Sequence, residues 1–282
     1  MTDRPDGPAT AMTPWHSISG SARQGTAIPA PVRAVAAGQP VRAVWENELG
    51  GITFEVGART DRCFVKWAPA ASGIDLGEEA ARLSWAVSFT PVPQLLSQGA
   101  DVTGSWIVTA ALPGQSAVAE RWKADPATAV AAIGEGLRAM HEAAATAACP
   151  FSWMAKDRLA DTRQRAGEGR IDPASWHPVH QPLGVGRALE LLADIPPIDR
   201  LVICHGDSCA PNTLLTDDGR WSGHVDLGEL GVADRWADLA IATWSTEWNY
   251  GPGWDNLLLR AYGVPPDPDR TRYYRLLWDL GP

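Results

Sequence analysis

The sequence predicts an α+β fold in two lobes, with a small β-rich N-terminal lobe and a larger, mainly α-helical C-terminal lobe. Short runs rich in Val, Phe and Trp, separated by glycine turns, fill residues 40–69 and are typical of antiparallel strands. From residue 126 onward, Ala, Leu and Met recur at spacings of three and four residues, which indicates amphipathic helices. Two short apolar runs in this helical half flank a polar segment and predict a pair of strands there.

The N-terminal part of the chain is expected to contain a flexible arm, followed by a sheet with one helix. Residues 1–30 are rich in Pro, Gly, Ser and Thr and show no periodicity, which is typical of a disordered or loosely docked segment. The N-terminal lobe is then expected over residues 31–112. Its elements are predicted as strands within 40–57, 61–69 and 104–112 and a helix over 77–87.

The C-terminal lobe is expected over residues 113–282. Apolar residues at helical spacing, ended by glycine or proline, predict helices over 126–144, 154–169, 184–195, 234–248, 253–263 and 268–280. Short strands are predicted at 200–204 and 222–228, around the polar segment.

Composition and charge favour a globular cytoplasmic protein that binds a small molecule. The chain of 282 residues is 45% hydrophobic, and no apolar run reaches the roughly 18 residues of a membrane span. The N-terminus lacks the pattern of a secretory signal, and the four cysteines form no CxxC pair, which predicts reduced thiols. A net charge of −9 disfavours nucleic acid as a partner and permits a cationic ligand. Nothing in the sequence indicates an obligate protein partner.

The segment HGDSCAPN, which ends at Asn212, places polar side chains between two apolar runs. The carboxylate of Asp207 could accept the proton of a hydroxyl nucleophile. Asn212 and Asp226 offer the hard oxygen ligands that suit Mg²⁺. Lys66 in a predicted strand and Glu79 in the following helix could form an ion pair that holds phosphate groups. This spacing resembles that of protein kinases, in which such groups position a γ-phosphoryl group.

Each of these residues also has a simpler explanation. Asp207 and Asn212 could cap a helix or a turn. Lys66 could be a solvated lysine at the end of a strand. Glu78, rather than Glu79, could be the carboxylate that points inward.

Longer motifs make the chain resemble the aminoglycoside phosphotransferases, most closely the 3′-hydroxyl kanamycin and neomycin kinases. The motifs run from about residue 40 to the C-terminus as FVKW, EEAARLSW, CPF, VICHGDSCAPN, GRWSGHVDLGELGVADRWADLA and YYRLLWD. HGD alone would be a weak signal, but HGDxxxxN followed by DxGxxGxxDRxxDLA is a specific one. The resemblance implies a protein-kinase-like fold that uses ATP with Mg²⁺.

The resemblance also implies roles for individual residues. Asp207 would be the catalytic base, and Asn212 and Asp226 would be the Mg²⁺ ligands. Lys66 would contact the α- and β-phosphates, and Glu79 would orient it. The adenine would meet backbone groups near Thr109 to Ala111. The residues expected to support the loop and the following helix are His205, Asp234, Arg235 and Asp238.

Glu229 is the first departure from the family, which commonly has Arg three residues after the metal-binding Asp. A carboxylate there would raise the pKa of neighbouring carboxylates, weaken phosphate binding or recruit another cation. Alternatively, Glu229 turns toward Arg235 or solvent, where it is harmless.

The acceptor site is the second departure. The family lines this site with carboxylates that hold a polycation, whereas the corresponding segments here, 171–184, 243–251 and the C-terminus, are rich in Trp and His. The predicted acceptor residues are Trp176, Trp244, Glu247, Trp248, Trp278 and Asp279, with His177, His180 and Trp254 nearby. Since Trp is also common in cores, each of these rings could be simple packing. We expect an acceptor that is flatter, more apolar or less cationic than kanamycin, and a streptomycin-like or other aminoglycoside stays open.

The sequence therefore predicts an ATP- and Mg²⁺-dependent small-molecule O-phosphotransferase, similar to the aminoglycoside phosphotransferases. The alternatives are a kinase for another natural product or metabolite, and a nucleotide-binding regulator or pseudokinase. A protein kinase is disfavoured because no activation-loop segment is recognisable between Asp226 and the DLA motif.

Overall fold

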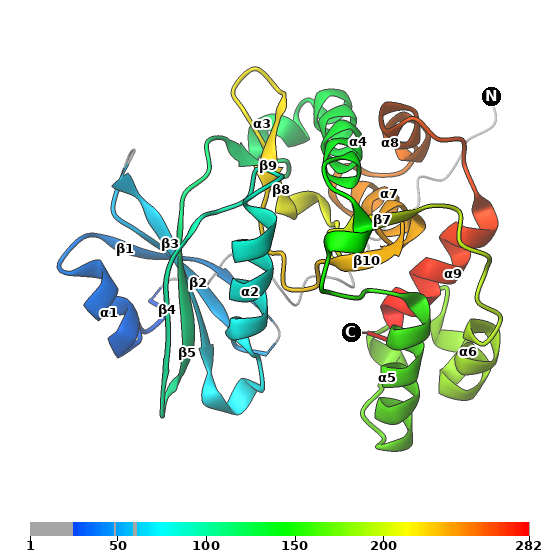
Figure 1. Ribbon diagram of the computed structural model, residues 1–282, viewed down its shortest axis with the longest axis horizontal. Helices are drawn as coiled ribbons and strands as arrows, with labels where there is room; N and C mark the ends of the chain where they lie inside the picture. Colours follow the sequence, from blue (N-terminus) through cyan, green and yellow to red (C-terminus); the bar gives the residue numbers. More distant parts are fainter. Residues whose placement is uncertain (1–24, 48, 59–60, 282) are drawn as a thin grey trace, which may run out of the picture.

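The N-terminal region of the computed structural model is built on a five-stranded antiparallel sheet (Figure 1). The structure describes residues 25–47, 49–58 and 61–281. In spatial order the strands are β1 (Val41–Glu46), β2 (Ile52–Val56), β3 (Cys63–Pro69), β5 (Gly104–Ala110) and β4 (Leu95–Asp101). Most of the predicted arm, residues 1–24, lies outside the described residues.

The alternation of side chains along β3 aims Lys66 toward the C-terminal region. Val65 packs in a buried cluster with Val32 of helix α1 (Ala30–Ala36), on one face of the sheet. Ala68 packs in another cluster with Leu83 of helix α2 (Leu76–Ala86), on the opposite face. Since successive side chains of a strand point to opposite faces, Lys66 shares the face of Ala68.

Helix α2 lies on the side of the sheet that faces the C-terminal helices (Figure 1). The carboxylate of Asp75 caps it by accepting the backbone N–H of Gly77 at 2.8 Å. Its buried residues recur at helical spacing as Leu76, Glu79, Ala80, Leu83 and Ala86. Glu79 is therefore a carboxylate among the otherwise apolar residues on the buried face of α2.

The C-terminal region is mainly helical, as predicted. Its helices are α3 (Glu120–Lys123), α4 (Pro126–Glu142), α5 (Ala155–Gly167), α6 (Gly184–Leu192), α7 (Trp236–Tyr250), α8 (Asp255–Tyr262) and α9 (Pro268–Asp279). The strands β6 (Gln115–Ser116), β8 (Thr213–Leu215) and β9 (Trp221–His224) form one small sheet, and β7 (Leu201–Cys204) pairs with β10 (Gly231–Asp234). Short 3₁₀ turns occupy Ala70–Ser72, Thr146–Ala148, Pro173–Ser175, Gln181–Leu183 and Ala210–Asn212.

An apolar cluster joins the two regions next to the polar segment. It contains Leu83 of α2, Ile107 of β5, Met140 of α4, Ile203 of β7 and Leu230 from the loop before β10. Burial of these side chains from both regions fixes the position of the sheet relative to the helices. The α+β fold class is confirmed, whereas the boundaries at residues 30/31 and 112/113 stay predictions.

Several elements differ from the prediction. Helix α1 and the edge strand β4 were not expected, because α1 has only seven residues and most side chains of β4 are partly or fully exposed, without an apolar alternation. The strand predicted over 222–228 ends at His224, so Asp226 lies in the loop that follows it. Helix α7 begins at Trp236, because Asp234 belongs to strand β10. Across the described part of the chain, no helix is both long and apolar enough to cross a bilayer.

Candidate active site

Lys66 is the centre of an ion-pair network between the sheet and the C-terminal region. Its Nζ donates to Oε2 of Glu79 at 2.7 Å and to Oδ1 of Asp226 at 2.6 Å. Burial alone would lower the pKa of Lys66, but the carboxylates of Asp226 and Glu79 outweigh it and raise the pKa above its ordinary value. Glu78 is more exposed and pairs with Arg82 at 2.6 Å, so Glu79 is the carboxylate that contacts the lysine.

The two carboxylates that bind Lys66 differ in acidity. Burial raises the pKa of Glu79 more than the lysine lowers it. In Asp226, burial also acts to raise the pKa, but the charge and hydrogen bond of Lys66 outweigh it and lower the pKa overall. Asp226 is therefore the more firmly ionised member of the pair.

Asp207 lies in the loop after β7 and has one carboxylate oxygen without a partner. The side-chain amide of Asn212 donates to the backbone carbonyl and to Oδ2 of Asp207, at 3.0 Å each. Oδ1 of Asp207 is buried and accepts no hydrogen bond from the described residues. Burial raises the pKa of Asp207 and nearby Asp226 raises it further, against the opposing effects of His205, the Cys209 thiol and Asn212. Such an oxygen is suited to accept a hydrogen bond or proton from a bound hydroxyl.

His205 and Gly206 shape the backbone before Asp207. His205 accepts the Asp207 backbone N–H at Nδ1 (3.2 Å) and donates Nε2–H to the carbonyl of Val225 (3.0 Å). These two bonds set one tautomer of the ring and tie the loop to the segment that contains Asp226. Gly206 has φ +87°, and a Cβ there would lie 2.2 Å from the carbonyl oxygen of Glu229, so the position requires glycine.

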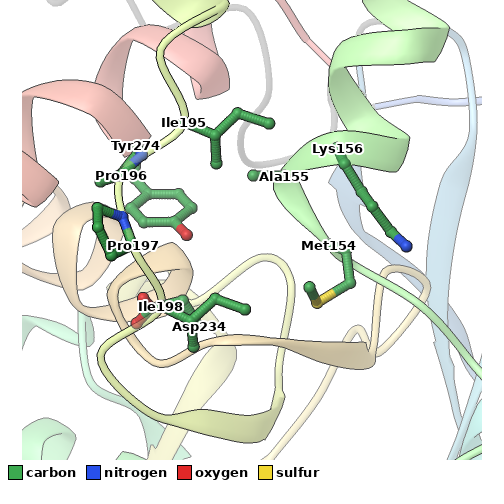
Figure 2. Close-up of a pocket in the computed structure, with 9 residues that line it drawn as sticks. All are labelled: Met154, Ala155, Lys156, Ile195, Pro196, Pro197, Ile198, Asp234 and Tyr274. Carbon is green, nitrogen blue, oxygen red and sulfur yellow. The ribbon is translucent and has the colours of Figure 1, made fainter.

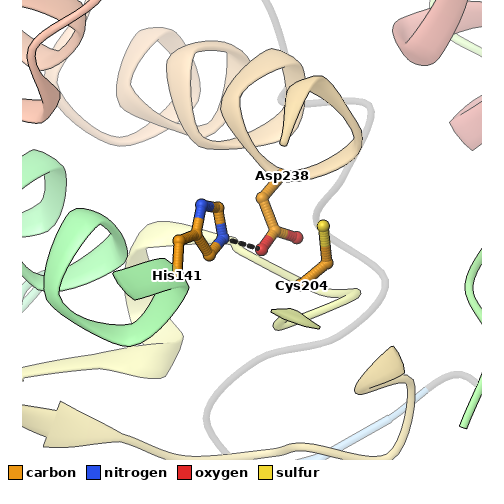
Figure 3. A group of neighbouring side chains, drawn as sticks. All are labelled: His141, Cys204 and Asp238. Carbon is orange, nitrogen blue, oxygen red and sulfur yellow. Dashed lines mark hydrogen bonds and ion pairs between the residues drawn. The ribbon is translucent and has the colours of Figure 1, made fainter. Parts of the chain in front are cut away.

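Asp238, in the first turn of α7, holds this loop through its backbone. Its carboxylate accepts the N–H groups of His205 at 2.6 Å and Gly206 at 3.0 Å. It also accepts Nε2–H of His141 at 2.9 Å (Figure 3). The hydroxyl of Ser208 donates to the Asp238 backbone carbonyl at 2.7 Å. Burial acts to raise the pKa of Asp238, but His141 and the other donors hold it below its usual value. Asp238 is thus an ionised anchor for the loop, as the sequence suggested.

His141 was missed at the sequence level, although a polar side chain on the apolar face of its predicted helix was a signal. His141, Cys204 and Asp238 place one potential metal-ligand atom each within 4.8 Å of one another (Figure 3). The carboxylate of Asp238 is already used by three N–H donors. Burial raises the pKa of Cys204 well above its usual value, and the thiol donates to the carbonyl of Asp234 at 3.4 Å. The cluster therefore supports the loop rather than a metal ion.

Asn212 and Asp226, the predicted metal ligands, lie on adjacent segments. The N–H of Val225 donates to the carbonyl of Asn212 at 2.9 Å, and Thr213 pairs with His224 across β8 and β9. Asp226 has φ 63°, in the left-handed region that non-glycine residues rarely adopt. Backbone strain of this kind clusters at functional sites, where it aims a side chain.

The predicted adenine segment connects the sheet to the C-terminal region. Thr109 is buried in β5, and Ala111 directly follows the last residue of that strand. The N–H of Ala110 donates to the carbonyl of Gln94 at 2.9 Å, which ties this connection to the residue before β4.

Glu229 is partly buried, and the charges that act on its carboxylate include those of Arg82 and Arg158. Burial raises the pKa of Glu229, while the positive charges of Arg82 and Arg158 act to lower it. Arg235 instead donates to Asp199 at 2.6 Å. The charge reversal at this position is therefore partly compensated within the fold.

Four rings near the end of α7 form a continuous aromatic wall: His177, His180, Trp244 and Trp248. The ring centroids of Trp244 and Trp248 are 5.2 Å apart, and those of His177 and Trp244 are 4.7 Å apart. The helix that contains both Trp residues touches the polar loop, because Ser245 accepts the N–H of Ala210 at 2.9 Å. Helix α7, which contributes Trp244 and Trp248 to the wall, is thus in contact with the loop of Asp207.

The carboxylates of this wall are mostly committed to basic groups. Asp279 has only 2% of its side chain exposed and accepts Nδ1–H of His180 and the backbone N–H of His177. Arg275 lies 5.2 Å from the Trp244 ring centroid and 3.7 Å from Asp255. Glu247, by contrast, is exposed. Trp176 is 1% exposed and packs in the main core, and Trp244 is 2% exposed, so the fold buries both of these predicted acceptor residues. Trp248, Trp254 and Trp278 are partly buried.

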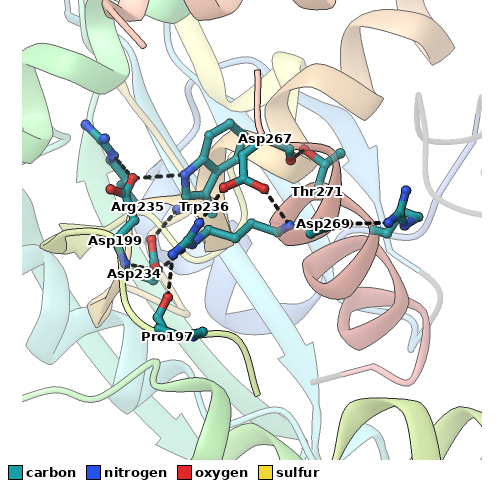
Figure 4. A network of polar contacts seen from close by, with 10 residues as sticks. Pro197, Asp199, Asp234, Arg235, Trp236, Asp267, Asp269 and Thr271 are labelled. Atoms are coloured by element: carbon teal, nitrogen blue, oxygen red, sulfur yellow. Dashed lines mark hydrogen bonds and ion pairs between the residues drawn. The ribbon is translucent and has the colours of Figure 1, made fainter. Parts of the chain in front are cut away.

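Two further features lie away from this site. Asp234 accepts the N–H groups of Trp236 at 3.0 Å and Asp199 at 2.8 Å, and so anchors the start of α7 (Figure 4). A cavity of about 370 Å³, with Tyr274 and Met154 on opposite sides, lies between α5, α9 and residues 195–198 (Figure 2). None of its lining residues was predicted to bind nucleotide, metal or acceptor.

Comparison with known proteins agrees with this geometry. Residues 45–274 match the model of the phosphotransferase enzyme family. The chain belongs to this family. It is 35% identical over 258 residues to an aminoglycoside 3′-phosphotransferase of Streptomyces fradiae, covering 83% of this chain and 92% of that relative. It is also 35% identical over 251 residues to a streptomycin 3″-kinase of Streptomyces griseus, covering 82% of this chain and 89% of the relative.

Solved structures of the family have the same fold. A crystal structure of an aminoglycoside 3′-phosphotransferase of type VIII superimposes with a TM-score of 0.76 at 29% identity, over 88% of this chain and 97% of that one. An aminoglycoside phosphotransferase of Streptomyces rimosus, solved with ADP and streptomycin, gives 0.69 at 25% identity, over 88% and 95% of the two chains. The predicted resemblance to the aminoglycoside phosphotransferases and the phosphotransferase class are confirmed.

Proposed function

We propose that the chain transfers the γ-phosphoryl group of ATP to a hydroxyl of a small molecule, with Mg²⁺ as the cation. The proposal rests on one arrangement of charged groups. Lys66 of the N-terminal sheet forms an ion pair with Asp226 of the C-terminal region, and Asp226 is close to Asp207, which has a carboxylate oxygen without a hydrogen bond from the described residues. The S. rimosus relative solved with ADP supports the choice of nucleotide. A lysine, a metal-binding pair and a base beside them are the parts that phosphoryl transfer requires.

Lys66 would hold the α- and β-phosphates. Its ammonium group is fixed by two carboxylates, so little reorganisation is needed when phosphate oxygens approach it. Glu79 would orient the lysine from α2, and backbone groups of residues 109–111 would meet the adenine.

Asn212 and Asp226 would hold Mg²⁺. The donor set fits this ion, because the amide nitrogen of Asn212 is committed to Asp207 and its amide oxygen is the atom that could coordinate a cation. Asp226 supplies an ionised carboxylate on the adjacent segment. When bound, Mg²⁺ neutralises phosphate charge.

Asp207 would act on the acceptor. Its free Oδ1 would accept a hydrogen bond from the acceptor hydroxyl and orient it for in-line attack. As the new O–P bond forms and the bond to the β-phosphate oxygen breaks, Asp207 takes the hydroxyl proton. A raised pKa makes this carboxylate a better base than an exposed aspartate.

Two observations bear on the chemical class of the acceptor, and they favour different classes. Relatives named for 3′-phosphorylation of aminoglycosides and for streptomycin support an aminoglycoside. The aromatic wall, with Asp279 bound to His180 and Arg275 beside Asp255, supports an acceptor with fewer cationic groups than kanamycin. Trp248 and Glu247 are the proposed contacts, whereas the buried rings of Trp176 and Trp244, with Trp278, would support them by packing.

A nucleotide-binding regulator is not favoured, because the charged groups needed for transfer are present in one site. We propose a cytoplasmic location, since that compartment supplies ATP. No observation favours nucleic acid as a partner.

Acceptor-dependent release of ADP tests the proposal. The enzyme with ATP and Mg²⁺ would be assayed against kanamycin, neomycin, streptomycin, hygromycin, a macrolide and simple amino alcohols. We expect at least one acceptor to stimulate ADP release, and excess EDTA to abolish it. Failure to bind ATP or ADP at all would contradict the proposed function.

Replacing Arg275 with Gln is expected to improve the binding of polycationic acceptors. The change removes a positive charge beside Asp255 and Glu247, so the affinity for kanamycin should increase about fivefold while the KM for ATP stays constant. Arg272 on the same helix is 74% exposed and pairs with Asp269, so Arg272→Gln is the matched control. Calorimetric titration with kanamycin measures the affinity of both variants. Weaker binding to Arg275→Gln would contradict the proposal that the charge of Arg275 opposes polycationic acceptors.

A further inference from the structure

Arg82 links two parts of the site without lying among the groups proposed to meet nucleotide or acceptor. It follows Glu79 on α2 by three residues, and its Nε donates to the backbone carbonyl of Leu230 at 3.0 Å. Leu230 follows Asp226 by four residues, in the same loop. The helix that contains Glu79 is therefore hydrogen-bonded to the loop that contains Asp226.

The guanidinium of Arg82 is held on several sides. Its Nη1 donates to the carboxylate of Glu78 at 2.6 Å and to the Glu78 carbonyl at 3.2 Å. Its central carbon lies 4.9 Å from the ring centroid of Phe151, whose carbonyl accepts the N–H of Val232 in β10. Only 14% of the Arg82 side chain is exposed. A planar guanidinium can make these contacts together, whereas the ammonium of a lysine cannot.

These contacts close a ring around the proposed phosphate site. Lys66 bonds Glu79 and Asp226, α2 leads from Glu79 to Arg82, and the loop leads from Leu230 back to Asp226. The side chain of Leu230 is also buried against α2, but apolar contact is non-directional. The hydrogen bond from Arg82 is the directional element that fixes the loop relative to the helix.

The loop that Arg82 holds also supports the segment of Asp207. The backbone of Glu229, next to Leu230, packs so closely on Gly206 that no Cβ could fit there. The carboxylate of Glu229 lies in the field of both Arg82 and Arg158, one from α2 and one from α5. The loop that Arg82 holds therefore both contains Asp226 and contacts the segment of Asp207.

We propose that Arg82 is a positioning residue that sets the separation of Glu79 and Asp226 around Lys66. This inference rests on the proposed function, because it assigns Arg82 the task of shaping the site for nucleotide and its cation. Loss of the bond to Leu230 should let the loop move away from α2, which weakens nucleotide binding and slows transfer without direct loss of a ligand-binding group.

Arg82→Gln and Arg82→Lys test the proposal, with Glu78→Gln as the matched control. The control removes the ion pair of Arg82 but leaves its bond to Leu230. Both Arg82 variants should raise the dissociation constant for ADP in the presence of Mg²⁺ about tenfold and lower kcat, with the acceptor KM unchanged. Glu78→Gln should behave like the wild type.

Amide hydrogen exchange provides a readout that needs no ligand. Both Arg82 variants should exchange faster over residues 76–86 and 226–231 and normally elsewhere. Unchanged exchange in these segments, or equal loss of protection throughout the chain, would overturn the proposal. Wild-type protein that binds no nucleotide would refute the proposed function, and with it the role of Arg82.

Discussion

Replacing Asp207 with Asn is expected to lower kcat by about 10²–10⁴-fold and to leave nucleotide binding nearly unchanged. Asn keeps the shape of the side chain and can still accept the amide N–H of Asn212, but it cannot take a proton from an acceptor hydroxyl. Lys66 and its two carboxylate partners are untouched by the change. Steady-state kinetics with the best acceptor and calorimetric titration with ADP measure the two effects. Weaker ADP binding at unchanged kcat would contradict the assignment.

The same substitution is expected to stabilise the protein at neutral pH. Burial and nearby Asp226 raise the pKa of Asp207, so the folded state binds a proton more tightly than the unfolded state. Stability therefore decreases as the pH rises from the ordinary Asp pKa of about 4 through the raised value. Asp207→Asn removes the free-energy cost of burying the ionised carboxylate, so the Tm of this variant should exceed that of the wild type at pH 7.5. Asp218→Asn, at an exposed turn, is the control.

Replacing Asp238 with Ala is expected to reduce the free energy of unfolding by about 3–5 kcal/mol. The change leaves the N–H groups of His205 and Gly206 and Nε2 of His141 without their acceptor in the interior. For a chain of this size, such a loss corresponds to a decrease in Tm of about 5–8 °C. Thermal unfolding followed by calorimetry measures it, with Asp218→Ala as the exposed control.

The effect of Asp238 should depend on pH. The hydrogen bonds of Asp238 hold its folded pKa below the unfolded value, so its stabilising contribution is present above about pH 4 and is lost as the pH falls through the folded value. The difference in Tm between wild type and Asp238→Ala should therefore shrink in acid. A variant as stable as the wild type at pH 7.5 would show that Asp238 does not anchor the loop.

The parts of the site that could be predicted are those whose chemistry leaves a local pattern. HGDSCAPN placed Asp207 and Asn212 five residues apart, and the structure brings their side chains within hydrogen-bond distance. An alternating strand followed by an amphipathic helix indicated that Lys66 and a glutamate of the helix would face each other. The periods of strand and helix alone could not decide between Glu78 and Glu79. Which of two adjacent helix residues faces the sheet depends on the rotation of the helix about its own axis, and the sequence pattern does not define that rotation closely enough.

The remaining parts depend on contacts between segments far apart in the sequence. The sequence alone did not connect Glu229 with Arg82 or Arg158, whereas in the fold the positive charges of these two residues, from helices α2 and α5, act on its carboxylate. Asp279 looked like an acceptor ligand, but the fold buries it against His180, 99 residues earlier in the chain. Such pairings are set by how helices pack and not by local spacing, so a single sequence carries little signal for them.

Transfer of label from [γ-³²P]ATP to a small-molecule acceptor tests the central claim most directly. Wild type and Asp207→Asn would be incubated with labelled ATP, Mg²⁺ and each acceptor, and the products separated and the phosphorylated position determined. The site described above predicts a stable O-phosphorylated acceptor with the wild type and almost none with the variant. Label released only as inorganic phosphate, or equal product from both proteins, would contradict it.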